Sequence, residues 1–198
     1  MNIRPATVAD VPAMVDLAND FAEHGLMIHR SRAEMYERVR DFVVAVDEDE
    51  MVIGVCGLRI MWANLAEVYA LAVAKSAHGR GIGKQLVLRI IDQARLYRIH
   101  RLFSLTYERA FFEKCGFTVV DRTTLPLKVW GECIRCPKHE ACDEIAMVCV
   151  LDDVPDLGTP LPTTGTATRY DAPMIPRVTE ATLKIDVNAA AKEPQLDD

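Results

Sequence analysis

The residues with the clearest chemical potential form one continuous stretch, from Glu67 to Lys84. Its first part, Glu67–Val73, has no strongly polar face and predicts a strand in the middle of a covered sheet. Three glycines follow between positions 79 and 83, and an apolar stripe of helical period begins directly after them. A strand, a glycine-rich loop and a helix in this order are typical of phosphate binding. Glycine lets the backbone approach an anion, and the first N–H groups of the helix are unpaired.

Two familiar nucleotide-binding motifs are absent from this loop. A Walker loop requires Ser or Thr after Gly-Lys, whereas Gln85 stands at that position. The glycine spacing also differs from the Gly-x-Gly-x-x-Gly fingerprint of dinucleotide-binding folds. Arg80 and Lys84 add positive charge to the loop. A tight turn that only begins a solvated helix is the alternative interpretation.

A second group of reactive side chains lies in the segment 130–147, which contains Cys133, Cys136, His139 and Cys142. Thiolate and imidazole groups are zinc ligands, but this spacing is more compressed than in ordinary structural zinc sites. We therefore expect a cluster of reduced thiols that shapes a loop and holds no metal. A zinc site is the alternative.

Length and composition predict one domain of ordinary size followed by an extension. The chain has 198 residues and a formal net charge of −6, which argues against a general nucleic-acid surface. It has no apolar run of membrane-spanning length and no signal-peptide pattern, so we expect a cytoplasmic protein without a membrane or nucleic-acid partner. Repeated prolines and a Thr-rich stretch predict a domain over residues 1–151 and a flexible extension over residues 152–198.

Periodicity elsewhere predicts the elements that must position the glycine loop. The expected fold class is α/β, a mixed sheet flanked by helices, in the order β-α-α-β-β-β-α-β-α-β-β. Ser31 is the expected cap of the second helix. The clearest expected elements are strands at 2–4, 42–46, 51–61, 67–73, 102–106 and 145–151, and helices at 83–98 and 109–115.

The strand and loop together resemble the acetyl-CoA motif of the GNAT superfamily of N-acetyltransferases. The matching residues are Leu71–Val73 and His78–Gly83, with His78 where that superfamily usually has Gln or Arg. The segment FFEKCGF at residues 111–117 is similar to the Phe-Tyr-Glu-Lys-x-Gly-Phe segment of the same superfamily. The resemblance implies a GNAT fold with acetyl-CoA as co-substrate. The cofactor-binding residues it implies are Leu71, Ala72, Val73, His78, Gly79, Arg80, Gly81, Ile82, Gly83, Lys84 and Phe112.

The cysteine-containing segment narrows this resemblance. Together with residues 105–107 and 111–112, the segment 129–147 is similar to the short, single-domain bacterial N-acetylglutamate synthases, over roughly residues 2–151. This resemblance implies an enzyme that acetylates the α-amino group of L-glutamate in the first step of arginine biosynthesis, with a homodimer left open. The alternatives are acetyl transfer to another small amine or amino acid, and a non-catalytic acetyl-CoA sensor.

The same resemblance assigns candidate roles to three side chains. Glu67 matches a position where family members carry a glutamate that acts as general base, directly or through water. The usual acid tyrosine is replaced by Phe112, which leaves Tyr107 as the nearby candidate to protonate the leaving thiolate. Arg30, between two helices that cover the acceptor pocket in the resembled fold, is the candidate partner of a substrate carboxylate. An ordinary structural role is the alternative for each of them.

Overall fold

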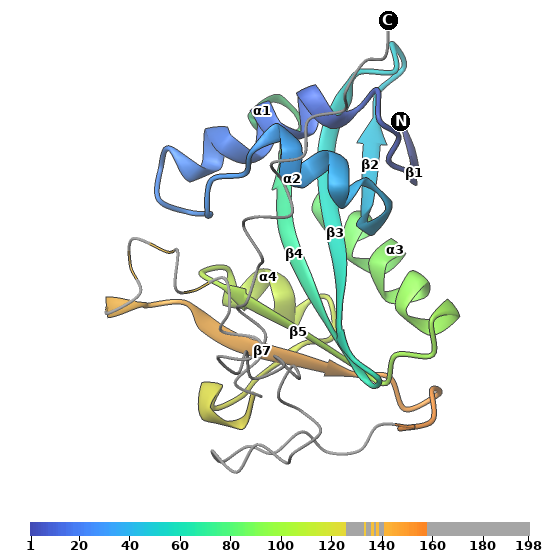
Figure 1. The fold of residues 1–198 in the computed structure, drawn as a ribbon, viewed down its shortest axis with the longest axis vertical. Helices are drawn as coiled ribbons and strands as arrows, with labels where there is room; N and C mark the ends of the chain where they lie inside the picture. The colour runs from blue at the N-terminus through green and yellow to red at the C-terminus, as the bar shows by residue number, and fades with distance from the viewer. Residues whose placement is uncertain (126–132, 134–135, 137, 139–140, 158–198) are drawn as a thin grey trace, which may run out of the picture. The chain divides into compact units, whose positions relative to one another are not determined.

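A seven-stranded mixed sheet forms the centre of the protein, in the order β1-β2-β3-β4-β5-β7-β6 (Figure 1). The computed structural model describes residues 1–125, 133, 136, 138 and 141–157. Neighbouring strands in this sheet are antiparallel, except that β4 and β5 run parallel. The strands are β1 (Asn2–Pro5), β2 (Phe42–Val46), β3 (Val52–Trp62), β4 (Leu65–Val73), β5 (Arg101–Thr106), β6 (Thr118–Val119) and β7 (Ile145–Val150).

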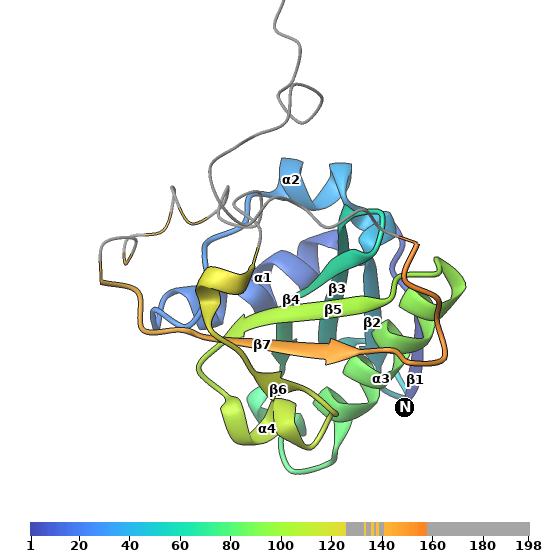
Figure 2. The same cartoon turned by 90° about the horizontal axis from the view of Figure 1, so that it is seen from below.

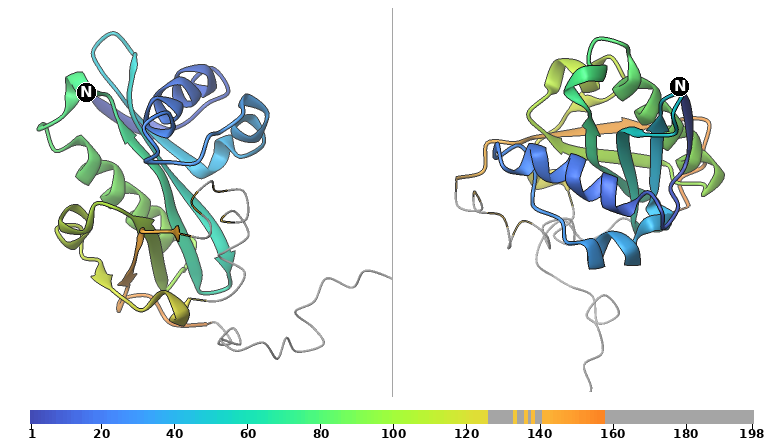
Figure 3. Two further views of the ribbon diagram at one scale, coloured as in Figure 1. Left: turned by 90° about the vertical axis from the view of Figure 1, so that its left-hand side faces the viewer. Right: turned by 90° about the horizontal axis from the view of Figure 1, so that it is seen from above.

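Helices cover both faces of this sheet (Figure 2, Figure 3). One face carries α1 (Val11–Ala22) and α2 (Arg32–Glu37), and the other carries α3 (Ile82–Leu96) and α4 (Arg109–Glu113). Each layer buries its own cluster of apolar side chains against the strands. The central strands are therefore covered on both sides, which explains why their sequences have no polar face. None of the described helices combines the length and the hydrophobicity that crossing a membrane requires.

The predicted fold class and order of elements are confirmed. The expected strand at 42–46 coincides with β2, and most other boundaries differ by one or two residues. Ser31 caps α2 as expected: its hydroxyl accepts the Glu34 N–H at 3.1 Å, and the Glu34 carboxylate accepts the Ser31 N–H at 3.1 Å. The helix predicted at 83–98 ends earlier, at Leu96, and Arg98 turns the chain with a φ of 59°.

A bulge interrupts β4 in the middle of the sheet. The register with β3 changes between the pairs Val55↔Ala72 and Gly57↔Tyr69, so β4 contains one more residue than β3 in this interval. Ala70 lies in the bulge with a φ of 50°, in the left-handed region that a Cβ disfavours. The sequence of β4 gave no indication of this irregularity.

The strands β4 and β5 are joined at one end. Within the described sheet they form three parallel pairs, from Leu65↔Arg101 to Glu67↔Phe103. Beyond Glu67 the two strands diverge, while β5 stays paired with β7 along its full length (Figure 1). The facing backbone edges of β4 and β5 are therefore available to a ligand.

The first residues beyond the predicted domain boundary pack against the domain. Val154 is buried, and its carbonyl oxygen lies 2.6 Å from Nδ1 of His100. Asp153 forms an ion pair with Arg95 at 2.8 Å. The remainder of the predicted extension, residues 158–198, lies outside the described residues.

The strain at Ala70 can be measured directly. Ala70→Val is expected to lower the free energy of unfolding by about 1–3 kcal/mol, because a β-branched side chain tolerates the left-handed region poorly. Ala70→Gly should stay within about 1 kcal/mol of the wild type, because the relief of strain offsets the greater freedom of the unfolded chain. Chemical denaturation of the three proteins checks this expectation. Equal stability of the Val and Gly variants would contradict it.

Candidate active site

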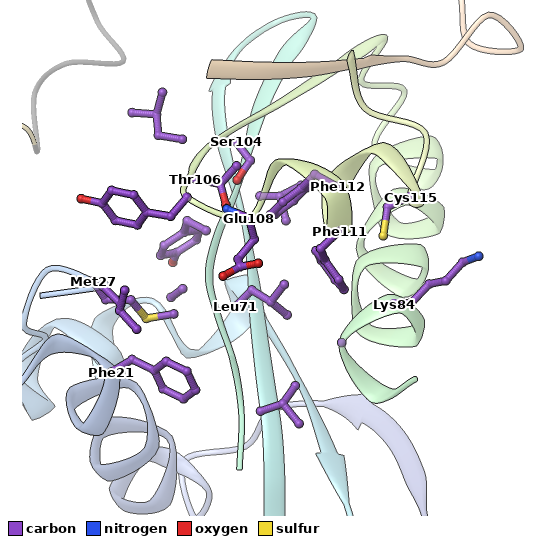
Figure 4. Close-up of a pocket in the computed structure, with 18 of the residues that line it drawn as sticks. Phe21, Met27, Leu71, Lys84, Ser104, Thr106, Glu108, Phe111, Phe112 and Cys115 are labelled. Atoms are coloured by element: carbon purple, nitrogen blue, oxygen red, sulfur yellow. The ribbon is translucent and has the colours of Figure 1, made fainter. Parts of the chain in front are cut away.

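The divergence of β4 and β5 opens a cleft of about 670 Å³. This volume lies in the range of small-molecule sites. Phe21 and Met27 enter the cleft from the side of α1, and Phe111 and Phe112 enter from the side of α4 (Figure 4). Leu71 of the β4 bulge lies between these two walls (Figure 4). The cleft is thus built by both helical layers and by the two strands that separate.

The predicted phosphate-binding loop forms one end of this cleft. Gly79 and Gly81 both have a φ of 74°, a conformation that glycine adopts without steric cost. Gly81 is the N-cap of α3, and among the described residues no side chain caps this terminus. A Cβ at either glycine would meet no described atom within 4 Å. The start of a 15-residue helix is therefore open to an anion.

The side chains around the loop do not all face the cleft. Nε2 of His78 lies 2.8 Å from the carbonyl oxygen of Val73, which ties the loop to the end of β4. Lys84 belongs to the cleft lining, but its amine points away from the other labelled residues (Figure 4). Arg80 is exposed, and the side chain of Ala72 is buried beneath α1; neither is in the described lining. For Ala72, only the backbone could contact a cofactor.

The apolar part of the predicted cofactor site lies along the cleft wall. Phe112 is 4% exposed and packs edge-on against Phe111 and Phe117, each at 5.2 Å between ring centroids. Such a wall suits the aliphatic arm of a cofactor better than its charged part. The predicted cofactor residues that line the cleft are Leu71, Val73, His78, Gly79, Gly81, Ile82, Gly83, Lys84 and Phe112.

Glu67 lies at the point where β4 and β5 separate, and it lines the cleft. The residue is 9% exposed. Its carboxylate forms an ion pair with Arg59, which is its register partner on β3. A guanidinium beside a carboxylate stabilises the ionised form, which is the form that can accept a proton.

The link between α1 and α2 brings Arg30 to the same end of the cleft. Both backbone groups of Arg30 are held by the side-chain amide of Asn19. The Arg30 N–H donates to Oδ1 of Asn19 at 2.9 Å, and Nδ2 of Asn19 donates to the Arg30 carbonyl at 3.0 Å. The guanidinium carbon of Arg30 lies 5.4 Å from the centre of the Tyr69 ring, and that of Arg59 lies 5.3 Å from it. The structure therefore brings together the predicted base and the predicted carboxylate partner.

Tyr107, the predicted general acid, lines the cleft and is contacted by Lys138. Nζ of Lys138 donates to the Tyr107 hydroxyl at 3.1 Å and lies 4.7 Å from the centre of the ring. Burial raises the pKa of Tyr107 above its usual value, against the opposing effect of Lys138. The hydroxyl therefore stays protonated at neutral pH and can donate a proton, although as a weak acid.

Sequence analysis does not identify several other polar residues of this cleft. The Thr106 hydroxyl accepts the Glu108 N–H at 2.9 Å, and the Glu108 carboxylate lies near Leu71 (Figure 4). Burial raises the pKa of Glu144, which also lines the cleft. Arg59 was missed as well, although a charged residue in an otherwise apolar strand is a signal that sequence analysis can use. The remaining residues missed are Tyr69, Ser104, Thr106, Glu108 and Glu144.

Two cysteines line the cleft as protonated thiols. Burial raises the pKa of Cys133 and of Cys115, so neither is a thiolate at neutral pH. In the part of the chain that the structure describes, no group of three or more His, Cys, Asp or Glu side chains could hold a metal ion. His139 lies outside that part. The cluster of reduced thiols therefore stays a prediction.

The open loop makes a direct test of cofactor binding possible. Gly81→Val is expected to weaken acetyl-CoA binding severely, because the new side chain occupies the space of the anion and disfavours the positive φ. Because the loop is open, the fold should survive. Gly116→Val is a matched control, since Gly116 has a φ of 89° and is not in the described cleft lining. Calorimetry measures the affinity of both variants for acetyl-CoA. An unchanged affinity in Gly81→Val would contradict the assignment of the loop.

Comparisons with known proteins agree with this geometry. The sequence matches the acetyltransferase (GNAT) family over residues 11–117. An uncharacterised N-acetyltransferase of Chlorobaculum tepidum is 36% identical over 146 residues, which cover 74% of this chain and 94% of that protein. An amino-acid acetyltransferase of Mycobacterium tuberculosis is 33% identical over 135 residues, which cover 67% of this chain and 77% of that protein.

A solved structure with a similar fold contains coenzyme A. The N-acetylglutamate synthase of Neisseria gonorrhoeae, complexed with coenzyme A and N-acetyl-glutamate, has a TM-score of 0.69 and 27% identity to this chain. The match covers 76% of this chain and 35% of the synthase, so the present chain corresponds to about a third of that protein. The family match, the shared fold and the open glycine loop lead to one conclusion: this chain belongs to the GNAT family and is an N-acetyltransferase with acetyl-CoA as co-substrate.

Proposed function

We propose that the protein acetylates the α-amino group of L-glutamate, and thereby catalyses the first step of arginine biosynthesis in the cytoplasm. One observation carries this proposal. The buried Arg59–Glu67 ion pair lies where β4 and β5 separate, and the guanidinium groups of Arg59 and Arg30 both lie near the Tyr69 ring. An amino-acid acetyltransferase and an N-acetylglutamate synthase among the similar proteins support the choice of acceptor.

The charges at this end of the cleft suit an amino acid with two carboxylates. Around the Tyr69 ring, Arg30 and Arg59 contribute two positive charges and Glu67 contributes one negative charge; the Glu108 and Glu144 carboxylates also line the cleft. Glutamate at neutral pH carries two carboxylates and one ammonium group, which is the complementary set. A polyamine would bring only positive charge to two guanidinium groups, and this contact is unfavourable.

Glu67 is well placed to prepare the acceptor for attack. The α-ammonium group of an amino acid is not nucleophilic until it loses a proton. In the proposed reaction the Glu67 carboxylate takes this proton, directly or through water, while Arg59 holds the carboxylate in place. The freed nitrogen lone pair then forms a bond to the thioester carbonyl carbon. The distance along β4 from Glu67 to Val73, about 20 Å at ~3.3 Å per residue, separates the base from the phosphate-binding end.

The unpaired edge of β4 has a role in the same step. As the nitrogen attacks, negative charge develops on the carbonyl oxygen, and backbone N–H groups of β4 near the bulge can stabilise it. The carbon–sulfur bond then breaks, and the electron pair leaves on the sulfur. A thiol has a pKa near ~8.5, so the thiolate leaves with little help from an acid. The nitrogen, positively charged once it has bonded to carbon, releases its second proton to water, and Tyr107 or water gives a proton to the thiolate, so the products are a neutral amide and a free thiol. Most of the acceleration comes from holding amine and thioester together.

A panel of acceptors tests the proposal. Release of CoA from acetyl-CoA is measured with glutamate, glutamine, aspartate, lysine and spermidine. The highest kcat/KM is expected with glutamate. If an amine without a carboxylate is turned over fastest, the acceptor belongs to another class and the proposal of glutamate is wrong. Acetyl-CoA binding without turnover of any acceptor would point instead to a sensor.

The general base can be tested by one isosteric change. Glu67→Gln keeps the volume of the side chain but cannot accept the amine proton. Turnover should fall roughly 10²–10⁴-fold, with little change in acetyl-CoA affinity. Higher pH should partly rescue the variant, because solvent then supplies the free amine. Glu48→Gln, in the exposed β2–β3 turn, makes the same charge change as a control. Near-native turnover of Glu67→Gln at neutral pH would show that the base lies elsewhere.

The role of Arg30 predicts a different kinetic signature. Arg30→Ala should raise the KM for glutamate roughly 10–100-fold, the effect of losing a hydrogen bond to a charged group. Because this contact is made in the ground state, kcat should change little. Arg32→Ala is the control, since Arg32 is an exposed arginine of α2 that is not in the described cleft lining. If both variants keep the wild-type KM, Arg30 does not bind the acceptor.

A further inference from the structure

A single aromatic ring organises the positive charge at the acceptor end of the cleft. Tyr69 of β4 is 6% exposed, and the guanidinium carbons of Arg30 and Arg59 lie 5.4 and 5.3 Å from its ring centre. Attraction between a cation and an aromatic face restrains a side chain that would otherwise sample many rotamers. Arg30 comes from the α1–α2 link and Arg59 from β3, so the ring brings together charges from two separate parts of the chain.

The Tyr69 ring is itself held from several sides. Its hydroxyl donates to Oδ2 of Asp41 at 3.3 Å, and its ring lies 5.1 Å from that of Phe42. Gly57 is its register partner on β3. A Cβ at Gly57 would lie 2.5 Å from Cε1 of the Tyr69 ring and 2.8 Å from Cε1 of Phe42. The missing side chain of Gly57 is therefore what allows the ring to lie across β3.

Arg59 connects this ring to the predicted base. Arg59 and Glu67 are direct cross-strand partners, and Gly57 and Tyr69 form the next but one pair, so all four lie on one face of the sheet. The side chains of Arg59 and Glu67 are 14% and 12% exposed. A guanidinium group presents five N–H donors in a planar fork, so it can bond one carboxylate and still direct a donor to a second.

We propose that Arg59 is a specificity-determining residue. It holds Glu67 and, together with Arg30 on the Tyr69 ring, selects an acceptor with two carboxylates over one whose side-chain carboxylate is replaced by an amide. This inference rests on the proposed function, because it assumes that the acceptor lies beside Glu67. Arg59 binds the side-chain carboxylate of the acceptor, while Arg30 binds the α-carboxylate. Glutamine, which has an amide in place of the side-chain carboxylate, does not gain this interaction.

The experiment compares glutamate and glutamine as acceptors for a set of variants. Arg59→Gln should raise the KM for glutamate roughly 10–100-fold and leave the KM for glutamine much less affected, because one charged contact is lost. It should also lower kcat for both acceptors, since Glu67 loses its partner. Arg59→Lys retains the charge without the planar fork and should restore part of the preference for glutamate. Arg40→Gln, an exposed position outside the described lining, makes the same change of net charge and should behave as wild type.

Two changes at Tyr69 separate the ring from its hydroxyl. Tyr69→Phe keeps the ring and should keep most of the preference for glutamate. Tyr69→Leu removes the ring and should lower the preference as Arg59→Gln does. A merely structural role of the ring would lower stability without changing the ratio of the two acceptors. Thermal unfolding and acetyl-CoA affinity, measured on every variant, identify those that remain folded.

The outcomes distinguish this inference from the proposed function. If the wild type turns over no amino acid with two carboxylates, the proposed function fails first. If the wild type prefers glutamate and a folded Arg59→Gln keeps the same ratio of kcat/KM values for the two acceptors, only the role of Arg59 is overturned. Should Arg59→Gln not fold, Arg59→Lys and Tyr69→Leu decide the question: an unchanged ratio in both would overturn the inference.

Discussion

The cleft depends on one constraint, the short pairing between β4 and β5. The β3–β4 ladder and the β5–β7 ladder are both long, whereas three residue pairs join β4 to β5 in the described sheet. The protein is thus built as two antiparallel blocks that meet at Glu67 and open away from it. Backbone groups without partners are costly to bury, so the open edges favour a ligand with its own amides, such as a CoA thioester. The bulge at Ala70 is the local distortion that accompanies this opening.

The buried ion pair at the junction is better explained by chemistry than by stability. Removing two charges from water costs about as much as their attraction returns, and an apolar pair of similar volume would often be at least as stable. Arg59 and Glu67 nevertheless occupy this position, where β4 and β5 separate and where Glu67 is the proposed base. The Tyr69 ring adds a second guanidinium beside them. The guanidinium groups can attract an anionic acceptor, and the carboxylate beside them is the proposed base.

Features that depend on neighbouring residues in the sequence were predicted. Features that depend on how β3 and β4 are aligned in the sheet were missed. The glycines from 79 to 83 and the Ser31 cap act on their immediate neighbours, and the structure has them as expected. The pairing of Arg59 with Glu67 requires the register of two strands, which periodicity does not provide. The role of Gly57 likewise appears only when Tyr69 is known to lie opposite it. His139 and part of the segment 130–147 lie outside the described residues, so the expectation there is untested.

The two halves of the cleft differ in whether backbone or side chains form them. The predicted cofactor half is made largely of backbone, with positive φ at Gly79 and Gly81 and the open start of α3, features that suit an anionic group. The proposed acceptor half is made of side chains from the α1–α2 link, β3 and β4. Proteins around 30% identical can thus share fold and cofactor while they differ in acceptor. In the proposed function, Arg30, Arg59, Glu67 and Tyr69 are the described side chains that select the acceptor.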